Sequence, residues 1–108
     1  MYVVNDNGTQ RGPIEIIQFP TKEIGQKWEF SVNLIKSTIA SVNEKLAVEG
    51  RAGHGTIDDY SQWLKIVFQH ISTFGKDKVP GDIQFSLNSV EEGLGLPVTS
   101  WPERNNDN

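Results

Sequence analysis

The sequence contains no cysteine, and this absence excludes several kinds of chemistry. Without cysteine the chain forms no disulfide, offers no thiol nucleophile and builds no cysteine-ligated zinc site. It also has no apolar run close to the roughly 20 residues that a membrane-spanning helix needs. Because its first residues lack the basic start and long apolar run of a signal peptide, we expect a cytoplasmic protein.

Basic residues are few and scattered along the chain. The sequence has 10 Lys and Arg against 14 Asp and Glu, which gives a formal net charge of −4. Residues 1–54 hold six side chains of each sign, whereas residues 55–108 hold four basic and eight acidic ones, so the excess lies in the second half. An acidic surface repels phosphate and attracts basic partners. We therefore expect no direct nucleic-acid binding, and a phage- or plasmid-type regulator that contacts nucleic acid stays an alternative.

The length of 108 residues is typical of one domain and leaves no room for a second. Hydrophobic residues make up 36% of the chain and charged residues 22%, a balance that is typical of globular proteins and not of disordered ones. We expect a single domain over residues 1–104, followed by a frayed polar tail over residues 105–108.

The N-terminal region predicts a pair of antiparallel strands. Tyr2-Val3-Val4 is a short β-prone run, and residues 14–19, rich in Ile and ending in Phe, read as a second and better defined strand. Asn7-Gly8 lies between them and is a strong tight-turn signal, because both residue types tolerate a positive φ.

Two long helices are predicted next. Residues 22–48 carry apolar side chains at steps of three and four, beginning at Ile24 and Trp28 and ending at Leu46, with Thr21 as the predicted N-cap. A second helix is predicted from about Thr56 to Gly75, with Asp58 and Asp59 at its N-terminal end. The short Gly-rich connection between them implies an antiparallel helical hairpin.

The C-terminal region predicts a third strand and a short helical turn. Ile83, Phe85 and Leu87 alternate with polar residues, which is typical of a half-buried strand. Ser89 to Glu92 resembles a capping box that opens a single helical turn. The expected fold is therefore an α+β two-layer sandwich of order β-β-α-α-β, with a small antiparallel sheet packed on the helical hairpin and a short C-terminal helical turn.

No catalytic or cofactor motif emerges from the sequence. The glycines between residues 50 and 55 follow a helix and lack the Gly-Lys-Ser/Thr of a phosphate-binding loop. His54 precedes Asp58 by four residues, and His70 lies on the second helix, so a small enzyme that uses His54, Asp58 and His70 is one alternative. No nucleophile or further metal ligand clusters with them, and we therefore expect a protein without catalytic activity, metal or cofactor.

The acidic residues of the second half are the most suggestive feature. They fall at turns and element ends, where one rim of a two-layer fold can gather them and steer a basic protein towards it. Trp101 lies outside both helices and is a candidate aromatic anchor. The predicted partner-binding residues are Asp58, Asp59, Asp77, Asp82, Glu91, Glu92 and Trp101.

The favoured function is a small non-enzymatic binding module for a basic protein. One concrete form is an inhibitor or immunity protein that neutralises a basic toxin or nuclease, because such inhibitors are small and acidic and fill a basic cleft. This expectation is an analogy between classes of protein, and it does not rest on a sequence match.

Overall fold

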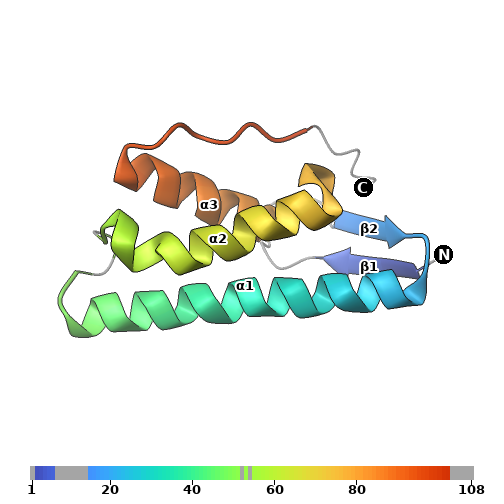
Figure 1. Cartoon of the computed structure of the whole chain (residues 1–108), viewed down its shortest axis with the longest axis horizontal. Coiled ribbons are helices and arrows are strands. Elements are labelled where there is room, and N and C mark those ends of the chain that lie inside the picture. The colour runs from blue at the N-terminus through green and yellow to red at the C-terminus, as the bar shows by residue number, and fades with distance from the viewer. Residues whose placement is uncertain (1, 7–14, 52, 54, 103–108) are drawn as a thin grey trace.

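The protein consists of a helical hairpin, a third helix and a small sheet (Figure 1). The computed structural model describes residues 2–6, 15–51, 53 and 55–102. Its elements are β1 (Tyr2–Asp6), β2 (Glu15–Phe19), α1 (Lys22–Val48), α2 (Ile57–Phe74), the 3-10 helix η1 (Lys76–Lys78) and α3 (Gly81–Leu94). The predicted α+β class, with a small antiparallel sheet packed against long helices, is confirmed.

The two strands pair antiparallel, with Tyr2 opposite Phe19 and Val4 opposite Ile17. Ile17 and Phe19 are buried while Gln18 between them is exposed, which is the alternation of a strand with one face on a core. The ring of Phe19 lies 5.3 Å from that of Trp28, so the sheet packs on the first turns of α1. The turn predicted at Asn7-Gly8 lies outside the described residues.

Helix α1 begins and ends where the sequence predicted. The Thr21 hydroxyl caps it by accepting a hydrogen bond from the backbone N–H of Ile24 at 3.2 Å. Trp28, Val32, Ile35 and Leu46 are buried along its predicted apolar face. The exposed Ile24 departs from that face, and two further members, Ile39 and Val42, are only half-buried.

Helix α2 runs antiparallel to α1 and completes the predicted hairpin (Figure 1). Trp63 is fully buried, and its indole N–H donates to the carbonyl oxygen of Ile35 at 3.1 Å. This bond satisfies the polar end of a large ring that otherwise packs among apolar side chains. Val67 is also fully buried, so the middle of α2 lies inside the core.

The third strand predicted over residues 83–87 is wrong, because these residues lie in α3. Ile83, Leu87 and Glu91 are buried at steps of four, which places them on one helix face, while Phe85 is 53% exposed. Ser89, the predicted start of a helical turn, lies inside α3 and not at its beginning. The sheet of the described residues therefore has two strands.

The segment after α3 runs back along the helices towards the opposite end of the molecule (Figure 1). Glu91 holds it there, since its buried carboxylate accepts bonds from the N–H of Thr99 at 2.9 Å and from the Thr99 hydroxyl at 2.7 Å. The Trp101 indole N–H donates to the Asn88 side chain at 3.1 Å. The predicted frayed tail, residues 105–108, lies outside the described residues.

None of the helices in the described ranges has the length and apolar character that crossing a membrane requires.

Candidate functional site: the end of the helical hairpin

His70 is buried between the two long helices and the 3-10 helix. Its Nε2 lies 3.1 Å from the carbonyl oxygen of Lys78, which only accepts hydrogen bonds, so Nε2 carries the proton. The other ring nitrogen, Nδ1, therefore accepts from the Ser31 hydroxyl at 2.7 Å. Burial lowers the pKa of His70, and the bond to Lys78 opposes this only in part. The ring is thus neutral near pH 7.

A serine beside a neutral histidine is the pairing of a nucleophile and its base, but its surroundings do not favour catalysis. Ser31 lies inside α1, where the helix itself uses the backbone N–H groups that an oxyanion hole would need. The carbonyl oxygen of Lys78 also accepts from the Trp28 indole N–H at 2.5 Å. We interpret the cluster as a polar tie that joins α1, α2 and η1.

The alternative enzyme site does not assemble from His70 and Asp58. Twelve residues of α2 separate them, about 18 Å at the helical rise of about 1.5 Å per residue. His54, the third member, lies outside the described residues. Within the described ranges no group of three or more His, Asp or Glu side chains is placed to hold a metal ion.

The predicted acidic residues do not share one rim, because they lie at both ends of the molecule and, in the case of Asp82, beside the middle of α1. The N-terminal end of α2 and the C-terminal end of α3 lie together at one end, beside the C-terminal end of α1 (Figure 1). Asp58, Asp59, Glu91 and Glu92 therefore belong to this end. Asp77 lies in η1 at the opposite end, and the Asp82 carboxylate forms an ion pair with Lys36 at 3.3 Å.

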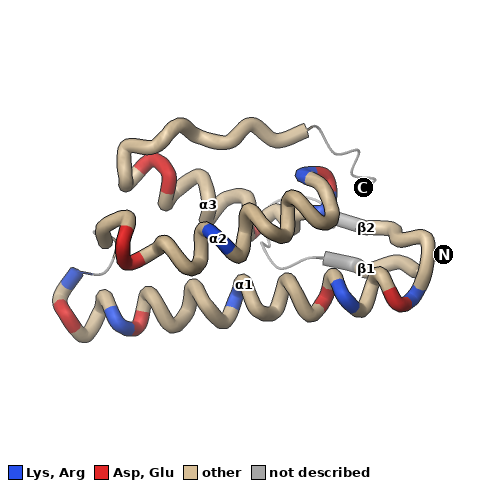
Figure 2. Tube along the Cα trace, in the orientation of Figure 1, with Lys and Arg blue, Asp and Glu red and all other residues tan. Residues whose placement is uncertain are grey.

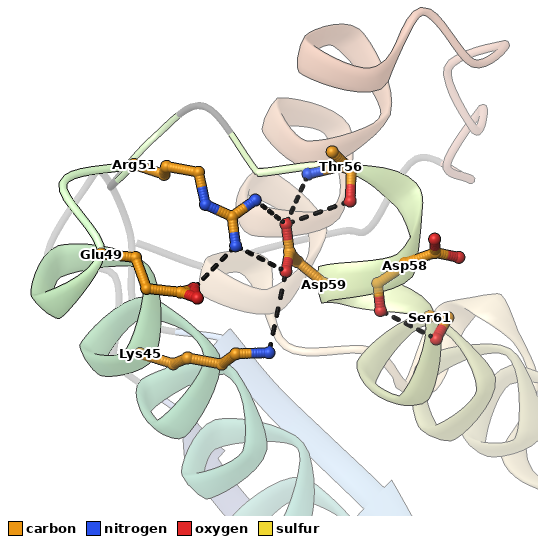
Figure 3. A network of polar contacts seen from close by, with 7 residues as sticks. All are labelled: Lys45, Glu49, Arg51, Thr56, Asp58, Asp59 and Ser61. Atoms are coloured by element: carbon orange, nitrogen blue, oxygen red, sulfur yellow. Dashed lines mark hydrogen bonds and ion pairs between the residues drawn. The ribbon is translucent and has the colours of Figure 1, made fainter.

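Asp59 is the centre of a polar network between the two long helices (Figure 3). Its carboxylate accepts from the backbone N–H of Thr56 at 2.8 Å and pairs with Arg51 at 2.8 Å and with Lys45 at 3.9 Å. The Thr56 N–H is the main cause that lowers the pKa of Asp59, and Arg51 adds to it. The pKa of Arg51 is raised, first by Glu49 and then by Asp59.

The same network explains the loop that precedes α2. Arg51 lies between the carboxylates of Glu49 and Asp59, so it links the C-cap of α1 to the first turn of α2. The two cations that the described residues place at this end, Lys45 and Arg51, are therefore engaged by carboxylates of the same chain. Asp59 therefore holds the hairpin closed, and its carboxylate is occupied by contacts within the chain.

Two other predicted site residues also make contacts within the chain. Glu91 is buried and holds Thr99. Trp101 is half-buried and packs against the core while it donates to Asn88. Of the predicted set at this end, Asp58 and Glu92 remain exposed and form no ion pair with another described residue. Figure 3 shows the Asp58 carboxylate directed away from the Arg51 network.

A cavity of about 260 Å³ opens at this same end, between α1, α3 and the loop before α2. We call it the end cavity. Ile39 borders it from α1 and Tyr60 from α2, and Phe85, Val90 and Leu94 border it from α3. Ile39 is half-buried because it packs against the core on one side and borders this opening on the other.

The end cavity lies within an acidic end of the molecule. The described residues here include six carboxylates against two cations, and Figure 2 shows the acidic residues on the ends of all three helices. Glu44, Asp58 and Glu92 are exposed and form no ion pair within the described part of the chain. We call these three residues the end carboxylates.

The sequence predicted Asp58 and Glu92 as partner-binding residues, but it gave no indication of Glu44 or of the cavity at this end. Glu44 belongs to the charge-balanced first half, so no count along the chain marks it. The cavity depends on the face that α3 presents, and residues 83–87 were expected to form a strand. Comparison of the chain with protein families, with curated proteins and with solved structures finds no match.

Proposed function

We propose that the protein is a binding module that engages a basic partner protein through the end of the hairpin that carries the end cavity. The observation that supports this is the position of the end carboxylates, Glu44, Asp58 and Glu92, on three helices at one end. No cation of the described residues neutralises them, whereas Asp59 and Glu49 are matched by Arg51 and Lys45.

Such a surface acts mainly on the rate of association. Carboxylates gathered at one end of a molecule attract a basic patch over distances of the order of the Debye length, about 10 Å at 0.1 M salt. Affinity then comes from a few buried contacts, for which a cavity is the usual receptor. An inhibitor or immunity protein that covers the basic cleft of a toxin or nuclease is the form of this function that we favour. The lack of cysteine is compatible with the cytoplasmic location that we propose for it.

The test is capture of partners from the native host by immobilised wild-type protein, followed by identification by mass. A variant with Glu44→Lys, Asp58→Lys and Glu92→Lys is the principal comparison. The matched control reverses charges at the opposite end, Glu23→Lys with Asp77→Lys. We expect a basic partner that the triple variant loses and the control retains, and whose association slows as salt is raised.

Three results would contradict the proposal. One is an acidic captured protein, and another is a basic protein that binds the triple variant as well as the wild type. The third is equal loss of binding in both charge-reversed variants, which would make the effect one of total charge and not of this end.

A further inference from the structure

We propose that the end cavity receives one uncharged aromatic side chain of the partner, from a segment in which lysine or arginine flanks that aromatic residue. This inference rests on the proposed function, because it uses the same end of the molecule. It adds the chemistry of the contact, an aromatic anchor between basic residues.

The lining of the end cavity suits an uncharged group. None of the described residues that line it is Asp, Glu, His, Lys or Arg. Its polar side chains are Asn43 from α1 and Ser86 and Ser89 from α3, which are neutral hydrogen-bonding groups. A charged head placed in the cavity would lose water and meet no opposite charge among the described residues of the lining, and this is unfavourable.

The size of the end cavity fits a single ring. An apolar cavity of about 150 Å³ holds benzene, whereas pockets for drug-sized ligands are about 300–1,000 Å³. The end cavity, at about 260 Å³, lies between these sizes. Tyr60 and Phe85 line it from different helices, and aromatic rings gain from stacked or edge-to-face contact with each other.

The charge around the opening selects what flanks the ring. The end carboxylates lie on the helices that border the cavity: Glu92 precedes the lining residue Gly93 and Asp58 lies two residues before Tyr60, while Glu44 lies on the neighbouring side of α1, where it lines a separate hollow. Flanking lysine or arginine residues of the partner therefore meet carboxylates that no described residue of this chain neutralises. Acidic flanks would be repelled, so the cavity and its border together select a basic–aromatic–basic segment.

The test uses three synthetic peptides as probes, each acetylated and amidated. The first is Lys-Lys-Phe-Lys-Lys, the second replaces Phe by Ala, and the third replaces the four Lys by Glu. Binding is followed by amide shifts of the labelled full-length protein in titrations at low and high salt. We expect the Phe peptide to bind about tenfold more tightly than the Ala peptide, which corresponds to partial burial of one ring, and the Glu peptide to show no binding.

Variants that fill the cavity test the location. Gly93 lines the cavity, and a Cβ at this position meets no atom within 4 Å, so Gly93→Phe places a ring in the opening without a backbone clash. Ser89→Phe is a second filling variant at an exposed position of the lining. Gly93→Ala is the matched control, because it adds a methyl group without filling the space. We expect both filling variants to abolish the preference for the Phe peptide and the control to keep it.

The outcomes separate this inference from the proposed function. One outcome is that the Phe and Ala peptides bind equally, that salt weakens both, and that reversal of the end carboxylates weakens both. This would overturn the aromatic anchor and would still support a basic partner. Absence of binding by both lysine peptides would overturn the anchor and also count against the acidic end as a contact surface. A wild-type protein that self-associates in sedimentation, and whose Gly93→Phe variant does not, would assign the cavity to a second copy of this chain and overturn the inference.

Discussion

At the scale of the residue, His70 couples the stability of the protein to pH. Burial lowers its pKa in the folded chain, whereas in the unfolded chain it titrates near the ordinary value of about 6.5. Above that value His70 is neutral in both the folded and the unfolded state, so it makes its full contribution to the free energy of unfolding. As pH falls below about 6.5 the unfolded state binds a proton that the folded state refuses, so the free energy of unfolding falls until the lower folded pKa is reached.

We predict that this loss is at most about 1.4 kcal/mol per pH unit, the value for one proton. The measurement is urea denaturation at several values between pH 7.5 and pH 5, for the wild type and for His70→Gln. The variant keeps His54 and every carboxylate, so the difference between the two slopes isolates His70. Parallel curves for the two proteins would show that His70 does not carry the dependence.

The same scale separates the carboxylates that bind within the chain from those that remain exposed. Asp59 and Glu91 are neighbours of Asp58 and Glu92 in sequence, yet their roles differ. Asp59 accepts from Thr56 and pairs with Arg51, and Glu91 holds Thr99, whereas Asp58 and Glu92 are exposed. In each pair the direction of the side chain, and not its type, decides whether it stabilises the fold or is available to a partner.

At the scale of the element, the hairpin was predictable and α3 was not. The apolar residues of α1 repeat at helical spacing from Ile24 to Leu46, about six turns, and a strand cannot use that spacing. In α3 the buried positions at steps of four are Ile83, Leu87 and Glu91. Because Glu91 is charged, the apolar pattern of the sequence does not show this helical period. Glu91 is buried because Thr99 supplies two hydrogen bonds, and this contact could not be read from the local sequence.

The alternation of Ile83, Phe85 and Leu87 was therefore coincidental, since Ile83 and Leu87 fit both a strand face and a helix face. Phe85 decides between them, because it is 53% exposed where a strand would have buried it with the other two. The candidate site was only partly predictable for the same reason. Charge counts identified the acidic second half, but the cavity and the pairing of Asp59 with Arg51 depend on how the three helices meet.

Substitution of two glycines by alanine tests whether residues 81–94 form a helix and whether the sheet packs on α1. Gly93 lies inside α3 with open space around it, so Gly93→Ala should stabilise the protein by up to about 1 kcal/mol through helix propensity. Gly25 is the matched comparison, because it lies inside α1 with the Tyr2 ring against it and has no room for a Cβ. Gly25→Ala should therefore destabilise despite the same gain in propensity.

Thermal and urea denaturation of both variants make the comparison. Tyr2 is the group that must move in Gly25→Ala, so the loss should be smaller in a Tyr2→Ala background. A destabilising Gly93→Ala would count against a helix at residues 81–94. An effect of Gly25→Ala that is the same in both backgrounds would show that the sheet does not pack on α1 as described.

At the scale of the whole molecule, charge is distributed unequally along an elongated shape with extents of 44 × 26 × 23 Å. The end with the cavity carries mostly carboxylates, while the other end mixes the lysines of η1 and of the first turns of α1 with acidic residues that include Glu23 and Asp77 (Figure 2). Under the proposed function, this asymmetry would orient a basic patch of the partner towards the cavity end before contact. The sheet and η1 lie away from the proposed contact.

The C-terminal segment runs between the two ends of the molecule. A Trp101→Ala variant distinguishes partner binding at Trp101 from binding at the end cavity. Its ring packs against the core and its indole N–H bonds Asn88, so we predict that Trp101→Ala destabilises the protein by about 1–3 kcal/mol, less than for a fully buried Trp. Capture of the basic partner by the folded variant should be unchanged, because Trp101 does not line the end cavity. Val98→Ala, at a 46% exposed position of the same segment, is the control and should change stability little. If Trp101→Ala left stability intact and abolished capture, Trp101 would be the anchor residue that the sequence suggested. That result would contradict the proposal that the partner binds at the cavity end.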